Sequence, residues 1–198
     1  MKHLRIVALG LLIVGWPLSG RVQQAGDQAD SGWITLLDGS NLDQWTTVGK
    51  AKWAVVDGVV QADGDSGHLV SKGSYGDFQI RAEFWVDAAA NSGIFIRCGD
   101  PQKIGTATCY EVNIFDQRPE ADYGTGAIVN VAKVSPPMPK AGGRWNTMEI
   151  TAKGPQMSVM LNGVRTAEGS DTKFASGRIT IQYGRGVVKF RKLQIRLL

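Results

Sequence analysis

Residues 77–87 read DFQIRAEFWVD and contain the pattern that decides the fold class of this chain. Apolar side chains recur at every second position of this stretch, at Phe78, Ile80, Ala82, Phe84 and Val86. Successive side chains of a β-strand point to opposite faces of its sheet, so a period of two indicates a strand with one buried face. The stretch therefore predicts an antiparallel strand that contributes one face to a core.

The same period of two recurs from Trp33 to the end of the chain. Further strands are expected at residues 92–98, 109–115, 145–152, 156–161, 178–183 and 187–197. Asn162-Gly163 directly follows one of these runs and is typical of a two-residue hairpin turn. In the last run the apolar phase changes, which predicts a β-bulge near Lys192.

Helical signals are missing, since no long stretch carries an amphipathic stripe with capping residues. Short strands separated by Gly, Asp, Asn and Pro turns predict an all-β fold, a jelly-roll β-sandwich of two antiparallel sheets. Residues 132–143 (AKVSPPMPKAGG) are expected to form a long loop, because their prolines lack the N–H that a central strand donates. Long loops of this kind are often functional, so we expect it to border a binding site.

The composition is that of one ordinary globular domain. The 198 residues are 43% hydrophobic and 20% charged, which excludes a chain that is disordered throughout. The formal net charge is +4, but residues 1–25 hold Lys2, Arg5 and Arg21 and no acidic residue, so 4 − 3 leaves +1 for the remainder. The sequence therefore predicts no nucleic acid or other polyanion as a partner.

Residues 1–25 have the organisation of a secretory signal peptide, with a positively charged start before the apolar run at residues 6–15 (IVALGLLIVG). A membrane span needs about 20 apolar residues, so the run is too short and no span is expected in the mature protein. We expect a secreted or periplasmic protein, in which a linker at residues 26–32 precedes a single domain at residues 33–198. A buried first helix is the alternative to a signal peptide.

Cys98 and Cys109 are the only cysteines, and the ten residues between them (GDPQKIGTAT) contain Gly and Pro. In the oxidising compartment that export implies, such a pair is most simply a disulfide that closes the loop. Two free thiols are the alternative. Beyond residues 1–25 the only histidine is His68, so no zinc site built from several His or Cys side chains is predicted.

Residues 109–116 read CYEVNIFD and contain the most informative group of polar side chains. Alternation places Glu111 and Asn113 on one side of the predicted strand, and a bulge at Phe115 would bring Asp116 to the same side. Two carboxylates beside an amide are the minimum for acid–base chemistry at a glycosidic bond or at a proton next to a carbonyl. The alternative is that these are the solvent-facing residues of an ordinary half-buried strand.

Arg97, His68 and Asn91 carry weaker signals. We expect Arg97 to share the face of the isoleucines before it and to be either buried and paired or lining a site. An unpaired buried arginine is very costly, so it needs a carboxylate partner, for which Glu111 is a candidate. His68 stands at a predicted loop-to-strand junction, which favours a structural or solvated role. Asn91 opens a predicted strand, where a turn is the simpler interpretation.

From Trp33 to Leu198 the chain resembles the 3-keto-disaccharide hydrolase domain family. The stretches that carry the resemblance follow one another in the family's order: LLDGSNLDQW (36–45), WAVVDGVVQA (53–62), YGDFQIRAEF (75–84), NSGIFIR (91–97), YEVNIFD (110–116), TGAIVNV (125–131), RWNTMEI (144–150), LNG (161–163), GRITIQYG (177–184) and VVKFRKLQI (187–195). The resemblance implies a concanavalin A-like jelly roll, secretion in bacteria, and hydrolysis of glycosides whose sugar carries a ketone at C3.

The chemistry that the resemblance implies gives these residues roles on a carbohydrate substrate. A ketone at C3 acidifies the proton on C2, so a base can remove that proton and expel the glycosidic oxygen from C1, after which water adds to the enone. We expect Glu111 to be the base, Asp116 the acid or a metal ligand, and Arg97 the positive stabiliser of the enolate. Four amides are expected to bind the substrate: Asn91, Asn113, Asn146 and Gln182.

One departure from the family concerns a metal. Many members show His after the Gln of the penultimate strand, whereas Tyr183 and Gly184 follow Gln182 here. A divalent cation, Ca²⁺ or Mn²⁺, is therefore left open as a cofactor. A non-catalytic carbohydrate-binding module and a scaffold domain remain as other interpretations. The stretch EVNIFD also has the spacing of the acidic strand of laminarinase-type β-glucanases, but Asn113 stands where the middle acid would be.

Overall fold

The computed structural model of the protein describes residues 32–198. The predicted signal peptide and all but the last residue of the predicted linker lie outside the described residues. Within that range the single helical element is the 3₁₀ helix η1 (Ala121–Tyr123), and no helix there is long and apolar enough to cross a membrane. The strands are β1 (Ile34–Leu37), β2 (Trp45–Val56), β3 (Val59–Tyr75), β4 (Phe78–Val86), β5 (Asn91–Cys98), β6 (Tyr110–Ile114), β7 (Arg144–Lys153), β8 (Gln156–Leu161), β9 (Val164–Ser170), β10 (Gly177–Arg185) and β11 (Val188–Leu197).

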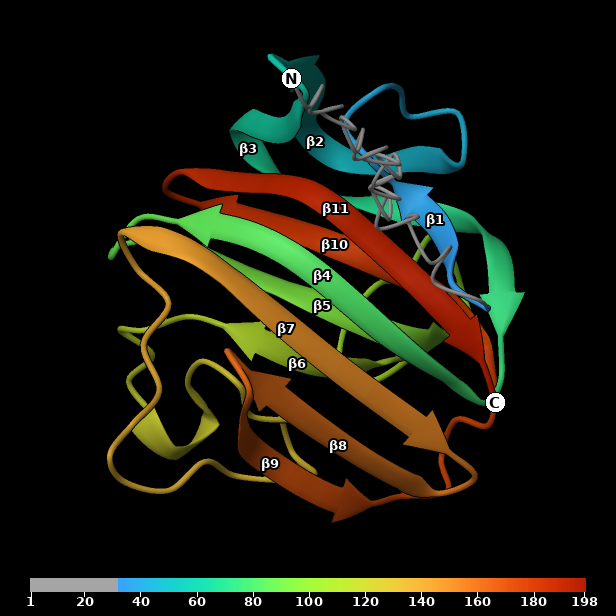
Figure 1. Cartoon of the computed structure of the whole chain (residues 1–198), viewed down its shortest axis with the longest axis vertical. Coiled ribbons are helices and arrows are strands. Elements are labelled where there is room, and N and C mark those ends of the chain that lie inside the picture. Colours follow the sequence, from blue (N-terminus) through green and yellow to red (C-terminus); the bar gives the residue numbers. More distant parts are fainter. Residues whose placement is uncertain (1–31) are drawn as a thin grey trace, which may run out of the picture. The chain divides into compact units, whose positions relative to one another are not determined.

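The strands form one continuous antiparallel sheet that folds back on itself, so that β11, β4 and β7 lie in front of β10 and β5 (Figure 1). The order is β6-β5-β10-β3-β11-β4-β7-β8-β9, with β1 beside β11 and β2 beside β3. The long β3 joins the two halves, because Val60 and Gln61 pair with β11 while residues 67–75 pair with β10. We call β2, β3, β10, β5 and β6 the β10 layer, and β1, β11, β4, β7, β8 and β9 the β4 layer.

The core lies between these two layers. In β4 the apolar residues from Phe78 to Val86 are at most 2% exposed, while the residues between them are only partly buried. They belong to one cluster with side chains of the β10 layer such as Ile94 and Ile181. The predicted all-β fold of two packed antiparallel layers is confirmed. The two predicted sheets are hydrogen-bonded to each other because β3 is long enough to belong to both.

Two local predictions are confirmed as well. Asn162 and Gly163 have positive φ values of 51° and 81° and join β8 to β9, as a two-residue hairpin turn requires. The register of β11 against β4 shifts between Phe190 and Lys192, which is the predicted bulge. The extra residue lets Phe190 and Leu193 both reach the core, where each is fully buried.

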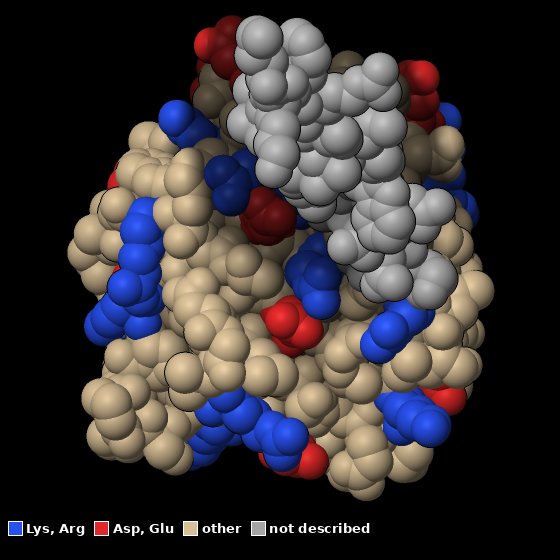
Figure 2. Space-filling model, viewed as in Figure 1, with Lys and Arg blue, Asp and Glu red and all other residues tan. Residues whose placement is uncertain are grey.

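The outward face of the β4 layer carries basic and acidic side chains that are interspersed (Figure 2). Arg191 pairs with Glu83 at 2.6 Å, and the ammonium of Lys189 lies 5.5 Å from the centre of the Trp85 ring. Charges of opposite sign therefore neutralise one another locally on this face. The outward face of the β10 layer is on the far side of the molecule in this view.

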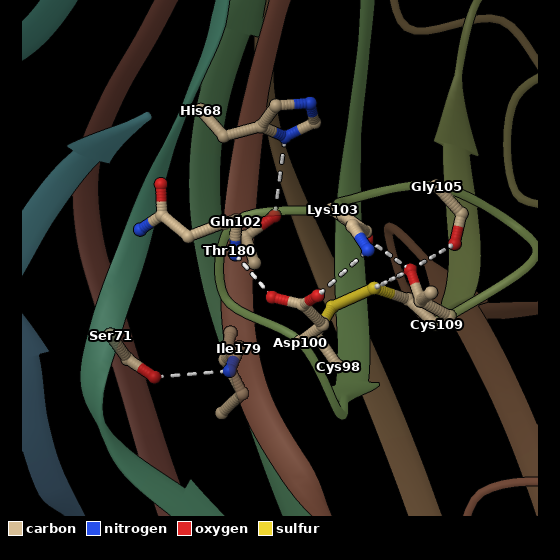
Figure 3. The surroundings of a disulfide bond; sticks show 11 residues. His68, Ser71, Cys98, Asp100, Gln102, Lys103, Gly105, Cys109, Ile179 and Thr180 are labelled. Atoms are coloured by element: carbon tan, nitrogen blue, oxygen red, sulfur yellow. Dashed lines mark hydrogen bonds and ion pairs between the residues drawn. A yellow bond between two sulfur atoms is a disulfide. The ribbon is translucent and has the colours of Figure 1, made fainter. Parts of the chain in front are cut away.

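Cys98 and Cys109 form the predicted disulfide, which closes the loop between β5 and β6 (Figure 3). The two cysteines pack with Phe95 and Ile104 in a small apolar cluster that is separate from the main core. The bridge therefore holds the loop at residues 99–108 against the outward side of the β10 layer.

Replacing both cysteines by serine is expected to lower the free energy of unfolding by about 3 kcal/mol, because the unfolded chain regains the freedom of a closed loop of this length. Denaturant unfolding of the oxidised wild type and of the double variant measures the loss. The reduced wild type is the control and should lose a similar amount. A loss below about 1 kcal/mol in both would contradict this account of the loop.

Candidate active site

β6 places Glu111 and Asn113 on the outward face of the β10 layer. The other three residues of this strand are at most 3% exposed and belong to the core, so the two polar residues between them point away from it. The register sets two rows of outward residues across the layer: Glu111, Phe95 and Thr180 in one, and Asn113, Gly93, Gln182 and His68 in the next. We call these residues the Glu111 face.

Gly93 leaves room for the carboxylate of Glu111. A Cβ atom at Gly93 would lie 3.5 Å from Glu111 Oε1 and 3.5 Å from a ring carbon of Phe95, so both side chains extend over the glycine. Among the described residues no hydrogen bond reaches this carboxylate. Burial raises the pKa of Glu111 above its ordinary value, because a charged carboxylate is costly where water is excluded. A half-buried, unpaired carboxyl group of this kind is suited to accept a proton.

Two amide oxygens on the same face have no hydrogen-bond partner within the described residues. Asn113 is fully buried, and its Nδ2 donates to the carbonyl oxygen of Tyr123 at 2.7 Å while its Oδ1 is unpaired. The buried Oε1 of Gln182 is unpaired as well. Each such atom costs about 1–3 kcal/mol, so the fold keeps two unpaired polar oxygens beneath this face at a cost in stability.

His68 also belongs to this face, within the continuous strand β3 and not at a loop-to-strand junction. Its Nδ1 lies 3.3 Å from the hydroxyl of Thr180 (Figure 3). Its ring stands edge-on to that of Phe95, with the ring centres 5.3 Å apart. Burial lowers the pKa of His68 to about 4, so the imidazole is neutral at neutral pH. The sequence does contain a signal for this position. His68 is two residues before Val70, and in a strand such residues have their side chains on the same face.

Arg118 is the cation that acts on Glu111. It lies in the loop after β6, and its positive charge lowers the pKa of Glu111 and offsets part of the effect of burial. The Nε atom of Arg118 is 3.4 Å from a carboxylate oxygen of Glu120, and its side chain is 24% exposed. Sequence reasoning missed this residue, because nothing in a loop pattern shows that the loop returns towards the strand before it.

Arg97 is fully buried, but its guanidinium is bound away from the Glu111 face. Its positive φ of 54° lies where β5 bulges against β10, and the bulge turns the side chain towards the loops that follow β3, β7 and β9. The guanidinium pairs with Asp77 at 3.1 Å and donates to three carbonyl oxygens, those of Gly76, Gly154 and Phe174. The predicted burial beside a carboxylate is confirmed, but the prediction that this partner is Glu111 is wrong. Arg97 is not brought together with Glu111.

Asp116 fixes the long loop at residues 132–143. Its carboxylate accepts hydrogen bonds from the Thr125 hydroxyl at 2.6 Å and from the backbone N–H groups of Ala141 and Gly142. β6 ends at Ile114, so the bulge predicted at Phe115 is not formed. The carboxylates of Glu111 and Asp116 therefore have separate surroundings, and the loop that was expected to border the site is tied to Asp116.

The remaining predicted amides divide between the two layers. Asn146 lies in β7 of the β4 layer and is 3% exposed, and its amide group is bonded to the carbonyl oxygens of Ala141 and Arg144 and to the Asn162 side chain. Asn91 begins β5 and is two residues before Gly93, so alternation places it on the side of the Glu111 face. The structure thus brings Glu111, Asn113, Gln182 and Asn91 to one surface and leaves Asn146 in another.

The carboxylates that could hold a metal are not gathered in one group within the described residues. Within residues 32–198 no group of three or more His, Cys, Asp or Glu side chains lies close enough to hold a metal ion. Glu111 is the one carboxylate of the Glu111 face, and the carboxylate of Asp116 is already engaged by N–H and O–H donors. The described residues therefore offer no cluster of several charged side chains for Ca²⁺ or Mn²⁺.

The fold belongs to the class of lectin-like, concanavalin A-like β-sandwiches. A candidate glycosyl hydrolase from Parabacteroides distasonis superposes with a TM-score of 0.74 and 21% identity, over 84% of this chain and 94% of that one. A second one from the same organism has a TM-score of 0.67 and 27% identity, over 84% and 99%. The carbohydrate-binding module CBM66 from Bacillus subtilis has a TM-score of 0.58 and 15% identity, over 83% and 95%, which shows a shared fold alone.

The family follows from the sequence match. The model of the 3-keto-alpha-glucoside-1,2-lyase-like domain matches residues 32–196, so the chain belongs to this family. A 3-keto-disaccharide hydrolase of Bacteroides thetaiotaomicron is 27% identical over 150 residues, which covers 60% of this chain and 52% of that protein. The chain therefore spans about half the length of this curated relative.

His68 makes the stability of the protein depend on pH. Between the ordinary pKa of 6.5 and the folded value of about 4, the unfolded chain binds a proton that the folded protein does not. Stability is therefore lost as pH falls through this window, by an amount on the order of 2–3 kcal/mol. His68→Gln should remove this part of the slope, which unfolding of both proteins at pH 7, 5.5 and 4 measures. Parallel stability curves for the two proteins would contradict the assignment.

Proposed function

We propose that this protein is an enzyme that cleaves glycosides whose sugar carries a ketone at C3, with Glu111 as the base. The observation that carries the proposal is the half-buried carboxylate of Glu111, which no described residue hydrogen-bonds and whose pKa burial raises. The partly exposed amide of Gln182 on the same face supports a polar substrate. Membership of the 3-keto-alpha-glucoside-1,2-lyase-like family supports a keto-sugar as that substrate.

The reaction begins with proton transfer from carbon. The C3 carbonyl withdraws electrons from the C2–H bond, and Glu111 takes this proton to leave an enolate. The electron pair then forms the C1–C2 double bond, the bond between C1 and the glycosidic oxygen breaks, and the leaving oxygen takes up a proton. Water adds across the double bond at C1 and C2 in the hydrolytic outcome. The lyase outcome stops before this addition.

The Glu111 face supplies the other parts of this reaction. The partly exposed side chain of Gln182 supplies an amide for hydrogen bonds with sugar hydroxyl groups, while the fully buried Asn113 lies beneath the face and holds the loop at Tyr123. A neutral imidazole retains one N–H, so His68 donates to an oxygen of the substrate without carrying charge. Arg118 provides the positive charge for the developing enolate, because its field already reaches Glu111. Arg97 has no part in this step, since Asp77 and three carbonyl oxygens engage it.

Export is part of the same proposal. We propose that residues 1–25 direct the chain to a secreted or periplasmic location, where its substrate is found. The disulfide between Cys98 and Cys109 supports this location, because such bonds persist in oxidising compartments.

Glu111→Gln should lower kcat on a 3-keto-disaccharide by about a hundredfold or more, because general-base catalysis of this kind contributes about 10²–10⁴. The amide is nearly isosteric, so KM should change little. Product release from 3-keto-disaccharides measures both constants. As pH is lowered, kcat/KM of the wild type should begin to fall at a higher pH than for a base with the ordinary pKa of Glu. The reason is that Glu111 must be ionised to act as the base and its pKa is raised.

Glu149→Gln is the matched control, because Glu149 is a partly buried strand glutamate of the β4 layer and is far from the proposed site in the sheet order. It should leave kcat unchanged. Equal losses in the two variants would contradict the role of Glu111. A wild-type protein that binds glycans but releases no product from any 3-keto-glycoside would instead be a carbohydrate-binding module.

A further inference from the structure

A hollow lies on the outward side of the β10 layer, between β2–β3 and the disulfide-closed loop. It has a volume of about 280 Å³ and is lined by Thr46, Val48, Val70, Ser71, Lys72, Pro101, Gln102 and Arg178. We call it the loop pocket. Val48 pairs with His68 and Val70 pairs with Thr180 across the sheet, so the loop pocket directly adjoins the Glu111 face.

The walls of the loop pocket differ in chemistry. Val48, Val70 and Pro101 give it an apolar side, which suits the C–H face of a sugar ring. Thr46 and Gln102 are exposed and supply a hydroxyl and an amide for hydrogen bonds. The volume is slightly below the roughly 300 Å³ at which ligand pockets commonly begin, so it suits a single small group.

Arg178 is held in a fixed orientation at this pocket. Its Nη1 donates to the carbonyl oxygens of Ser71 at 2.7 Å and of Lys72 at 2.6 Å. Its Nε and Nη2 make no hydrogen bond with any described residue, so that edge of the guanidinium remains available. A planar fork held in this way recognises a carboxylate without losing further side-chain freedom.

The charge around the loop pocket is positive. Lys72 and Arg178 line it, and no Asp or Glu is among its lining residues. The acid of the adjacent loop, Asp100, accepts the backbone N–H of Gln102 at 2.9 Å and lies 3.9 Å from the ammonium of Lys103. The carboxylate of Asp100 therefore interacts with residues of its own loop, as the dashed lines in Figure 3 show. It does not neutralise Lys72 or Arg178, so both positive charges can act on a ligand.

We propose that the loop pocket is a binding subsite for an acidic sugar unit, a uronate, in the saccharide chain attached to the glycosidic oxygen. The subsite rests on the proposed function, since it places this unit relative to Glu111. Neighbouring strands lie about 4.8 Å apart, so the pocket over β3 and β2, three and four strands from β6, is about 14–19 Å from Glu111 across the layer. A saccharide chain spans this distance, whereas a single sugar ring does not. The substrate class is therefore an acidic oligosaccharide whose terminal sugar has been oxidised at C3.

Equilibrium binding of trigalacturonate tests the subsite without turnover, with its fully methyl-esterified form as the matched neutral ligand. At low ionic strength the full-length protein should bind the acid about tenfold more tightly than the ester, because one charge-assisted hydrogen bond is lost in the ester. Lys72→Gln should reduce the preference to about threefold or less, and so should Arg178→Gln. Lys103→Gln should retain the preference, since Lys103 carries the same charge on the neighbouring disulfide-closed loop but does not line the pocket.

Equal affinity for acid and ester would overturn the subsite, as would a preference that survives in the Lys72→Gln protein. Lys72 is exposed, so its substitution should not affect folding. The Lys72→Gln protein therefore tests the subsite even if the Arg178→Gln protein does not fold. Glu111→Gln should retain the preference for the acid. A preference for the acid in a protein without keto-glycoside turnover would support the subsite while rejecting the proposed reaction. Turnover without any preference would reject the subsite alone.

Discussion

The packing of β6 against the core fixes the direction in which Glu111 points. Val112 and Ile114 are buried between the layers, and a shift of one residue would exchange them with Glu111 and Asn113. Such a shift would bury a carboxylate in hydrocarbon, so the register of β6 on β5 is strongly specified. Gly93 then leaves the space above the sheet to the Glu111 carboxylate and the Phe95 ring, which lie 3.5 Å from the position that its Cβ would take. The arrangement of the Glu111 face is therefore a consequence of strand alternation and of one missing side chain.

Strand alternation is also the part of the fold that the sequence reveals best. The strand at residues 77–87, the Asn162-Gly163 turn and the bulge near Lys192 each follow from a local pattern, and the structure has all three. The same rule placed Glu111 and Asn113 on one side correctly. The hydrogen bonding between the two layers was not predictable, because it depends on the length of β3 and its partners far along the chain.

The roles of Arg97 and Asp116 could not be read from the sequence for a physical reason. Arg97 is bonded mainly to backbone carbonyls of three distant loops, and Asp116 to backbone N–H groups of a fourth, and backbone groups leave no mark in a sequence. Both residues bind loops at the ends of the sandwich. By contrast, the carboxylate of Glu111 and the amide oxygens of Asn113 and Gln182 have no hydrogen-bond partner among the described residues. Polar groups that a fold leaves without partners cost stability, and they are more informative about a site than polar groups that are fully bonded.

The most direct measurement follows the hydrogen on C2 of the sugar. A 3-keto-disaccharide carrying deuterium at C2 is incubated with the protein in ordinary water, and its products are examined by mass spectrometry beside a sample without protein. Removal of this deuteron by Glu111 predicts products that have lost the label and a cleavage rate slowed by the isotope. Products that keep the deuterium in full, formed at an unchanged rate, would show that the glycosidic bond breaks without proton transfer from C2 and would contradict the proposed mechanism.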